Sequence, residues 1–400
     1  MPTEARGTVA TRPTAAERVR RWSPLVVLLA LLGHAVVLAV WPDAHLLLID
    51  LQVYQAGGRH VLDGQPLYDG GVLLTLPFVY PPAAALLFAP LAVLPLPLLK
   101  IAWTAASLLL LAYAVRRCLR TLGVPPGPAL TAAAVALVAV ATWLDPVRTT
   151  LYLGQINLLL LALVVGDVLG RRDSRWRGVG VGLAAALKLT PLLFVGYLLL
   201  VGRIRAACVA LGVFAATVAL GFVLAPADSV AYWLQGRFAA ADRISPPAAT
   251  TNHSFNGLIA RAFGETTWAY LLGALVLVAA TAWVALRAHR RDQELLAVTL
   301  CGLGTAAVAP FAWSHHWVWT VPLLVLVGHQ AVVRGGWRPV VLLAGLLVVT
   351  AAVITALPGP GVGPIPRTGL ISLLPDAYLG LFVVTLVVAG WSVRRVAATR

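Results

Sequence analysis

The sequence predicts an all-α polytopic integral membrane protein, and three observations support this fold class. First, 60% of the 400 residues are hydrophobic and only 11% are charged, whereas soluble domains carry about 25% charged residues. Second, apolar runs recur almost from end to end of the chain, and each approaches the roughly 20 residues that an α-helix needs to cross a bilayer. Third, arginines gather at alternate ends of these runs. This composition excludes a soluble globular protein.

The first apolar run, Ser23 to Trp41, follows a basic tail over residues 1–22. The positive-inside rule therefore predicts a cytoplasmic N-terminus. No small-residue cleavage site follows the run, so we interpret it as an uncleaved first helix. Hydropathy predicts further spans near 98–115, 128–145, 150–170, 206–225, 268–286, 295–313, 317–333, 338–357 and 377–393.

The net charge of +15 is divided unequally between the two sides of the membrane in this topology. In this topology 22 of the 30 basic residues lie on the inner face, including the C-terminal tail 394–400, and six lie outside. Nine of the 15 carboxylates lie outside. The basicity thus indicates orientation and contact with anionic lipid rather than nucleic acid.

Two apolar stretches do not fit simple spans. Residues 80–99 are broken by five prolines, and residues 178–201 are flanked by arginine at both ends. Each is either a dip into the membrane or a short pair of crossings, and irregular backbone at that depth needs a protein cavity around it. We therefore expect ten to twelve spans in one transmembrane domain over 23–393, with outer loops at 42–79, 226–267 and 358–376.

The chain has no P-loop, no GxGxxG after a strand, no HExxH and no zinc-spaced Cys/His set. Neither a cofactor nor a metal is therefore predicted by motif. The three cysteines lie in or near the membrane or the inner face, and no disulfide framework is expected.

The first outer loop holds the densest group of polar and aromatic residues. Asp50 follows the apolar stretch Leu46 to Ile49, which puts a carboxylate at the edge of an apolar wall, where a general base is useful. The alternative is that carboxylates of this loop are simply solvated.

Amide side chains are scarce, with only three asparagines in the chain. Gln155 and Asn157 lie at the outer end of a predicted span, where they either hold helices together or face a polar ligand. Asn252 precedes Arg261 in the second outer loop.

Lys188 is one of two lysines and lies inside the second irregular stretch, next to Pro191. An ionisable group at membrane depth indicates function, here the binding of a lipid phosphate. The alternative is a lysine that reaches the membrane surface along its own stem.

His315 and His316 lie among tryptophans at an outer turn between two spans. An aromatic belt at the interface would explain the tryptophans. Adjacent histidines point in different directions and suit contact with a phosphate or sugar better than one shared metal.

Together these segments resemble glycosyltransferase family 87, whose members are actinobacterial, polyprenyl-phosphate-mannose-dependent α-(1→2)-mannosyltransferases of the GT-C class. The matching blocks run in order from about residue 45 to 330. They are Asp50…Tyr54, Gly64-Gln-Pro-Leu-Tyr68, Tyr80-Pro-Pro82, Gly154-Gln-Ile-Asn157, Lys188-Leu-Thr-Pro191, Asn252…Arg261 and Trp313-Ser-His-His-Trp317. The likeness is strongest to the enzymes that branch lipomannan and lipoarabinomannan, with those that extend phosphatidylinositol mannosides next.

The resemblance implies a GT-C fold in the plasma membrane with an extracytoplasmic active site, a polyprenyl-phosphate-mannose donor and a mannan or phosphatidylinositol-mannoside acceptor. It implies that Asp50 is the catalytic base. Some relatives carry a second aspartate where this chain has Gln52, which places more weight on Asp50.

The remaining polar residues divide into two expected roles. The cationic or imidazole side chains would offset charge on the departing phosphate, and the others would hold sugar hydroxyls or the outer-loop scaffold. The first set is Lys188, His315, His316 and Arg261; the second is Tyr54, Tyr80, Gln155, Asn157 and Asn252.

Two other function classes stay open at this stage. A lipid or sugar transporter, or flippase, predicts ionisable groups near mid-membrane and repeated halves, whereas this chain holds its unusual residues mainly in outer segments. An inactive scaffold for envelope assembly is the third class.

Overall fold

We describe a computed structural model of the chain over residues 14–40, 48–171, 173–239, 245–264, 267–334, 336–356 and 374–395. Helices dominate these residues, which confirms the all-α class. One short antiparallel hairpin departs from it, with strands β1 (Gly71–Leu73) and β2 (Leu76–Pro77) inside the predicted first outer loop. This loop is thus folded rather than open.

Within the described ranges, five helices are long and apolar enough to cross a membrane. They are α1 (Ala15–Val40), α4 (Leu96–Thr121), α10 (Ile204–Leu224), α13 (Thr267–His289) and α17 (Ala377–Arg395). Large apolar side chains on them stay exposed, among them Leu271, Leu272 and Leu275 of α13. Such faces suit contact with lipid, as expected for a polytopic protein.

The remaining apolar helices are mostly shorter. They are α5 (Pro128–Ala141), α6 (Asp145–Leu153), α7 (Asn157–Val168), α8 (Val179–Leu187), α9 (Leu193–Leu200), α14 (Glu294–Val308) and α15 (Thr320–Arg334). Helix α16 (Trp337–Ala356) is 20 residues long, but only Pro339–Ala351 counts as an apolar helix. Helices α5 and α6 meet at a bend of 76° and count as a sixth candidate span if taken together. The ten to twelve spans stay a prediction, because length and composition alone select five or six.

The predicted span 150–170 is wrong as a continuous helix, because it breaks between α6 and α7. Gly154 adopts a left-handed conformation with φ of 73° at the end of α6, as glycine commonly does at a helix C-terminus. The backbone N–H of Gln155 then bonds Thr150 O at 2.9 Å, and α7 begins at Asn157.

Both irregular stretches are broken helices. Residues 80–99 form α3 (Pro82–Phe88) and the 3₁₀ turn η2 (Ala89–Val93) before α4 begins. Residues 178–201 form α8, the 3₁₀ turn η3 (Thr190–Leu192) and α9.

The predicted loops and tails are described in part. The first loop contains α2 (Ile49–Leu62) and the hairpin; residues 42–47 lie outside the described part. The second contains α11 (Pro226–Ser229), the π-helical turn η4 (Val230–Leu234), the 3₁₀ turn η5 (Arg237–Ala239) and α12 (Phe255–Phe263), with 240–244 and 265–266 outside it. Residues 1–13, 358–373 and 396–400 of the predicted tails and third loop also lie outside the described residues.

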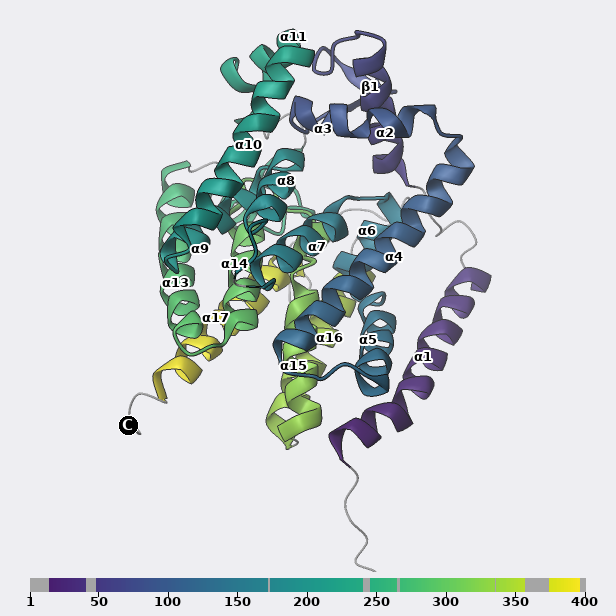
Figure 1. Cartoon of the computed structure of the whole chain (residues 1–400), viewed down its shortest axis with the longest axis vertical. Coiled ribbons are helices and arrows are strands. Elements are labelled where there is room, and N and C mark those ends of the chain that lie inside the picture. Colours follow the sequence, from purple (N-terminus) through teal and green to yellow (C-terminus); the bar gives the residue numbers. More distant parts are fainter. Residues whose placement is uncertain are drawn as a thin grey trace, which may run out of the picture.

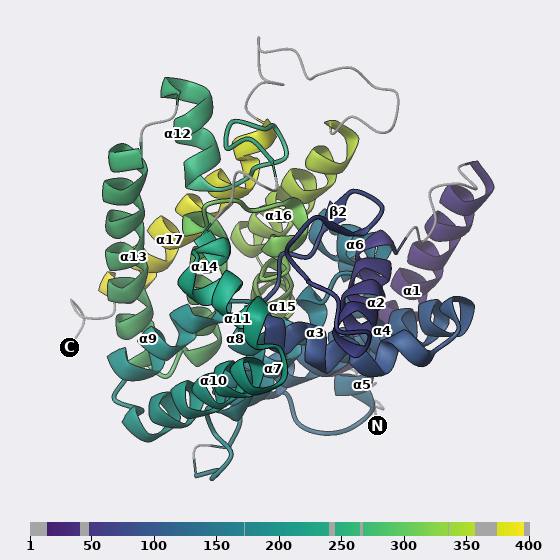
Figure 2. The same cartoon turned by 90° about the horizontal axis from the view of Figure 1, so that it is seen from above.

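The first-loop elements gather at one end of the molecule. Figure 1 shows α2, α3, β1 and α11 at the top, whereas α1 begins and α15 and α17 end at the bottom. At that lower end the guanidinium of Arg18 donates to Val332 O at 2.8 Å. Figure 2 looks down on the upper end and shows α2 and α6 side by side. The two helices also contact one another.

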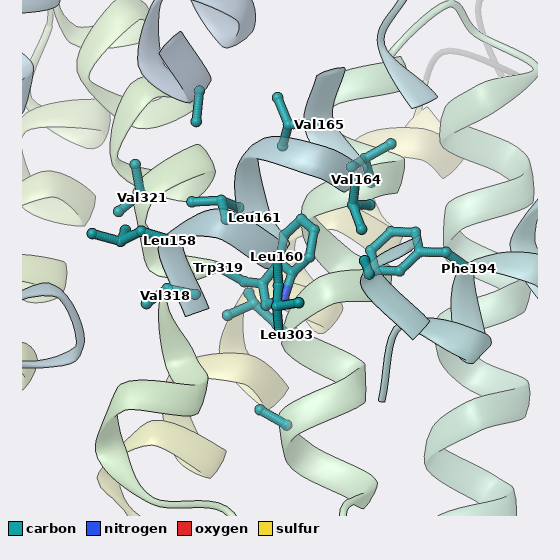
Figure 3. Packing of buried hydrophobic residues seen from close by; sticks show 14 of the residues in the cluster. Leu158, Leu160, Leu161, Val164, Val165, Phe194, Leu303, Val318, Trp319 and Val321 are labelled. Atoms are coloured by element: carbon teal, nitrogen blue, oxygen red, sulfur yellow. The ribbon is translucent and has the colours of Figure 1, made fainter. Parts of the chain in front are cut away.

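The core packs α7 against α14, α15 and α9 (Figure 3). The rings of Trp319 and Phe194 pack at a tilt of 31° with centroids 4.9 Å apart. Gly302 of α14 lies under the indole, where an added Cβ would come within 1.9 Å of a Trp319 ring atom. Close packing of this kind, rather than hydrophobic burial, holds helices together in lipid, and here it fixes the helix that carries Asn157.

Candidate active site

Asp50 stands in the first turn of α2, and that turn is docked on the break between α6 and α7. The backbone N–H of Leu48 donates to Tyr152 O at 2.8 Å. An added Cβ on Gly154 would lie 2.8 Å from the Cβ of Leu51, so only glycine permits this approach. Leu48 itself has a left-handed φ of 44°, which is strained for a leucine. The chain is therefore held firmly where the carboxylate projects.

Gln155 links that carboxylate to two buried tyrosines. Its Nε2 donates to Asp50 Oδ2 at 2.7 Å. Its Oε1 accepts from the hydroxyls of Tyr54 at 2.9 Å and Tyr80 at 3.3 Å, and these hydroxyls lie 2.9 Å apart. Because two donors engage the amide oxygen, the amide nitrogen must face Asp50. One carboxylate oxygen is thus fixed, and Oδ1 is the oxygen available to a proton.

Lys188 organises a second polar group. Pro191 lies in the first turn of η3, at a position where its missing N–H is harmless, and Lys188 is left extended at the end of α8. Its Nζ donates to His316 Nε2 at 2.8 Å and to Asn157 Oδ1 at 3.3 Å. Segments far apart in sequence thus place an amide, an ammonium and an imidazole together.

The two groups are electrostatically coupled. Gln155 and Asn157 belong to the same helix break, and the carboxylate of Asp50 interacts with the charge of Lys188. Withdrawal from water raises the pKa of Asp50 above its ordinary value, while the Gln155 bond and the Lys188 charge act in the opposite direction. A carboxylate with a raised pKa suits proton abstraction.

The histidines of the 3₁₀ turn η7 (Ser314–Trp317) are held neutral. Burial, and then the neighbouring charge of Lys188, lower the pKa of both His315 and His316 well below the ordinary value. A neutral His316 keeps the lone pair on Nε2 that accepts from the ammonium. Neither ring therefore carries positive charge at neutral pH.

Three buried nitrogens near this group lack a hydrogen-bond partner in the described residues: Nδ2 of Asn157 and both ring nitrogens of His315. Asn157 and His316 also line a cavity of about 30 Å³, floored by Phe194 and Trp319. Buried polar atoms are normally satisfied. Those of Asn157 and His315 are thus the groups best suited to meet a polar ligand.

Asn252 and Arg261 lie in a separate cluster, which ties together the loop predicted at 226–267. Asn252 is fully buried and bonds Ser254, Ala312, Pro247 and Pro310. Arg261 donates to the carbonyls of Ala249 and Asn252 at 2.9 Å and pairs with the carboxylate of Asp376. Among the described residues these contacts tie Asn252 into the loop and group Arg261 with it rather than with Lys188, while the roles predicted for both residues stay predictions.

A further buried hydrogen-bond and aromatic network supports η7, and the sequence patterns did not predict it. Tyr378 of α17 donates to Asp145 Oδ2 at 2.9 Å and stacks on Trp317. His253 meets the same tyrosine ring edge-on. The sequence did contain a signal at Asp145, because Asp followed by Pro146 is typical of a helix start. Its partner Tyr378, however, lies 233 residues away in the chain.

No group of three or more His, Cys, Asp or Glu side chains within the described ranges is placed to hold a metal ion. The site offers a carboxylate held by Gln155, the side chain of Lys188, and nitrogens of Asn157 and His315 that lack a partner among the described residues. A carboxylate and a lysine brought together on a polytopic helical scaffold are the kinds of group that general-base catalysis and charge stabilisation use.

Comparison with known proteins identifies the family. The profile of glycosyltransferase family 87 matches residues 78–314. The chain belongs to this family of GT-C membrane glycosyltransferases.

Three relatives extend the likeness over most of the chain. The polyprenol-phosphate-mannose-dependent alpha-(1-2)-phosphatidylinositol mannoside mannosyltransferase of Mycobacterium tuberculosis is 41% identical, covering 72% of this chain and 71% of that protein. Its namesake in Mycolicibacterium smegmatis is 39% identical over 78% and 76%. The corresponding pentamannoside mannosyltransferase of Mycobacterium tuberculosis is 35% identical over 86% and 80%. No solved structure matches the chain significantly.

Proposed function

We propose that this glycosyltransferase moves mannose from polyprenyl-phosphate-mannose to the 2-hydroxyl of an α-mannoside on a phosphatidylinositol mannoside. The names of the three relatives support the donor, the linkage and this acceptor. The sequence resemblance favoured lipomannan and lipoarabinomannan branching, and these acceptors remain part of the proposal as longer mannans built on the same lipid.

The observation that carries the mechanism is the Gln155 bond that fixes one oxygen of Asp50 beside the charge of Lys188. In the proposed step, Asp50 takes the proton of the acceptor hydroxyl. The hydroxyl oxygen bonds to the anomeric carbon of a β-mannosyl phospholipid as the bond from that carbon to the phosphate oxygen breaks. Attack from the opposite side inverts the centre, which yields an α-linkage and polyprenyl phosphate.

Lys188 stabilises the developing charge on the leaving phosphate. In this proposal the Nδ2 of Asn157 and the ring of His315 donate to phosphate or sugar oxygens, which is supported by their lack of partners among the described residues. His316 positions Lys188 through the 2.8 Å bond. Tyr54 and Tyr80 act through Gln155, and Asn252 and Arg261 act by holding the outer loop.

The proposed setting is the plasma membrane, with both termini cytoplasmic and the Asp50 side extracytoplasmic. The placement of α2 and α3 at the end opposite the start of α1 and the end of α17 supports this arrangement (Figure 1). The domain limits proposed from the sequence, 23–393 with outer loops at 42–79, 226–267 and 358–376, belong to the same proposal.

The test uses purified protein in lipid nanodiscs with synthetic polyprenyl-phosphate-mannose. A phosphatidylinositol mannoside and a short soluble α-mannoside serve as acceptors, and polyprenyl-phosphate-glucose serves as the control donor. We expect transfer of mannose alone, with an α-(1→2) linkage by methylation analysis and one polyprenyl phosphate released per bond. A glucosyl product, another linkage or no transfer to either acceptor contradicts the proposal.

A further inference from the structure

A pair of basic cavities lies at the ends of α7 and α8 that point away from Asp50. Helix α7 begins with Asn157, and α8 ends beside Lys188, so both helices reach the active site. Twelve residues of α-helix span about 18 Å, which separates these cavities from the chemistry. The two cavities adjoin, because Ser174 and Arg177 line both.

The larger cavity, of about 550 Å³, is amphiphilic. Arg117, Arg171 and Arg177 line its polar part, and Leu110, Leu163 and Leu183 line an apolar wall. Its rim includes Tyr113 and Trp176, whose side chains are 49% and 65% exposed. Aromatic residues with an apolar body and a polar tip are typical of the level of lipid headgroups.

The smaller cavity, of about 390 Å³, adds Arg203, Arg205 and His289. Nearby carboxylates offset only part of this charge. Glu294 pairs with Arg203 and His289 at 2.6 Å each, and Asp173 pairs with Arg171 in an exposed bridge, which contributes little.

The carboxylate of Asp167, which also lines the larger cavity, is already engaged in hydrogen bonds. Asp167 accepts from the backbone N–H groups of Gly178 and Val181 at the start of α8. Arg117 donates to Leu169 O at the end of α7, yet its Nε is buried and has no hydrogen-bond partner in the described part of the chain. Arg117 and Arg205 have no carboxylate partner among the residues described. The pair of cavities therefore retains positive charge next to an apolar wall.

We propose that these cavities bind the phosphate headgroup of an anionic phospholipid, with its acyl chains along the apolar wall. Guanidinium groups bind phosphate oxygens through paired, charge-assisted hydrogen bonds. Basic pockets between helices are suited to anionic headgroups, and exposed Leu109 and Ile204 on the adjoining helices offer a lipid-facing surface for the chains. A bound lipid bridges the ends of α7, α8 and α10 and so steadies the helix pair that carries Asn157 and Lys188.

The test measures lipid binding and does not depend on transfer activity. Full-length protein in neutral phosphatidylcholine nanodiscs is compared with protein in nanodiscs containing increasing phosphatidylglycerol, by native mass spectrometry and thermal unfolding. Glycerol phosphate and inorganic phosphate, without membrane anionic lipid, form separate arms. We expect phosphatidylglycerol to bind and raise the unfolding temperature, and the soluble phosphates to have little effect.

The variant is Arg171→Gln with Arg205→Gln, two exposed positions whose loss leaves helix packing intact, and the matched control is Arg116→Gln, an exposed neighbour that lines neither cavity. We expect about fivefold weaker lipid binding for each cavity arginine removed and unchanged binding in the control. Unfolding in neutral lipid checks that the double variant is folded. Equal losses in the control, unchanged binding in the double variant, or equally strong binding of soluble phosphate overturns the proposal.

Discussion

Gln155→Leu tests the electrostatic role of the Gln155 bond. The substitution removes the 2.7 Å hydrogen bond to Asp50 Oδ2 and leaves an apolar side chain that is one heavy atom shorter. A hydrogen bond to a charged group contributes about 1.5–3 kcal/mol, and one pKa unit corresponds to about 1.4 kcal/mol. Because the bond favours the ionised carboxylate, its loss raises the pKa of Asp50 by about one to two units.

The sign of the activity change follows directly. Only ionised Asp50 takes a proton, so activity falls as pH drops through its pKa. Burial already places the wild-type pKa above the ordinary value, and the variant loses activity at still higher pH. The assay is kcat/KM for mannosyl transfer against pH, from about pH 4 to 9.

Tyr54→Phe is the matched control, because Tyr54 contacts the oxygen of Gln155 and not Asp50. We expect a shift of less than about half a unit in this control, since its hydroxyl acts only through the amide. If the Gln155→Leu enzyme keeps the acidic limb of its pH profile at the wild-type pH and is slower by the same factor at every pH, the electrostatic reasoning is refuted. Gln155 would then act only by filling space.

Three further changes probe other contacts of the site. Lys188→Gln lowers kcat/KM about 10²–10³-fold, as expected for loss of a charge-stabilising donor, whereas Lys100→Gln leaves steady-state kinetics unchanged. Gly154→Ala lowers both thermal stability and activity, because alanine costs about 1–2 kcal/mol at its φ of 73° and also clashes with α2. Asn252→Ala destabilises the protein by about 2 kcal/mol or more by leaving buried partners unsatisfied, but Asn256→Ala, which loses one exposed bond, changes the unfolding temperature little.

Each of these three predictions has an outcome that would contradict it. Equal kinetic losses in the two lysine variants would remove Lys188 from the phosphate site. A stable, active Gly154→Ala enzyme, compared with Gly212→Ala where an added Cβ meets nothing within 4 Å, would contradict the close docking of α2. Equal thermal shifts in the two asparagine variants would contradict the scaffold role of Asn252.

Much of the fold was predictable because lipid imposes simple constraints on composition. The spans predicted near 98–115, 206–225, 268–286 and 377–393 coincide with long helices. The break after residue 153 was not predicted, because hydropathy averages over a window and one glycine barely changes it. The signal was the Gly154-Gln155 pair, a helix-ending residue followed by a costly amide.

The candidate site was predictable in residue type but not in pairing. Scarcity of amides and lysines in an apolar chain singled out Gln155, Asn157 and Lys188. In sequence, Gln155 lies 105 residues from its partner Asp50. Lys188 lies 31 residues from Asn157 and 128 residues from His316. Such pairing depends on how whole helices pack, so local sequence rules cannot specify it. The same limit hid the Asp145 network.

Asp50 is the residue on which the proposed mechanism depends most. Removal of a general base typically costs about 10²–10⁴-fold in rate, and Asn is nearly isosteric with Asp. Asp63, exposed at the end of the same helix, supplies a matched control.

The most direct measurement is therefore single-turnover mannosyl transfer by Asp50→Asn and Asp63→Asn in nanodiscs, with folding of both variants checked by thermal unfolding. We predict a rate about 10²–10⁴-fold below wild type for Asp50→Asn and a near wild-type rate for Asp63→Asn. Near-full transfer by a folded, membrane-inserted Asp50→Asn enzyme would contradict the assignment of Asp50 as the base.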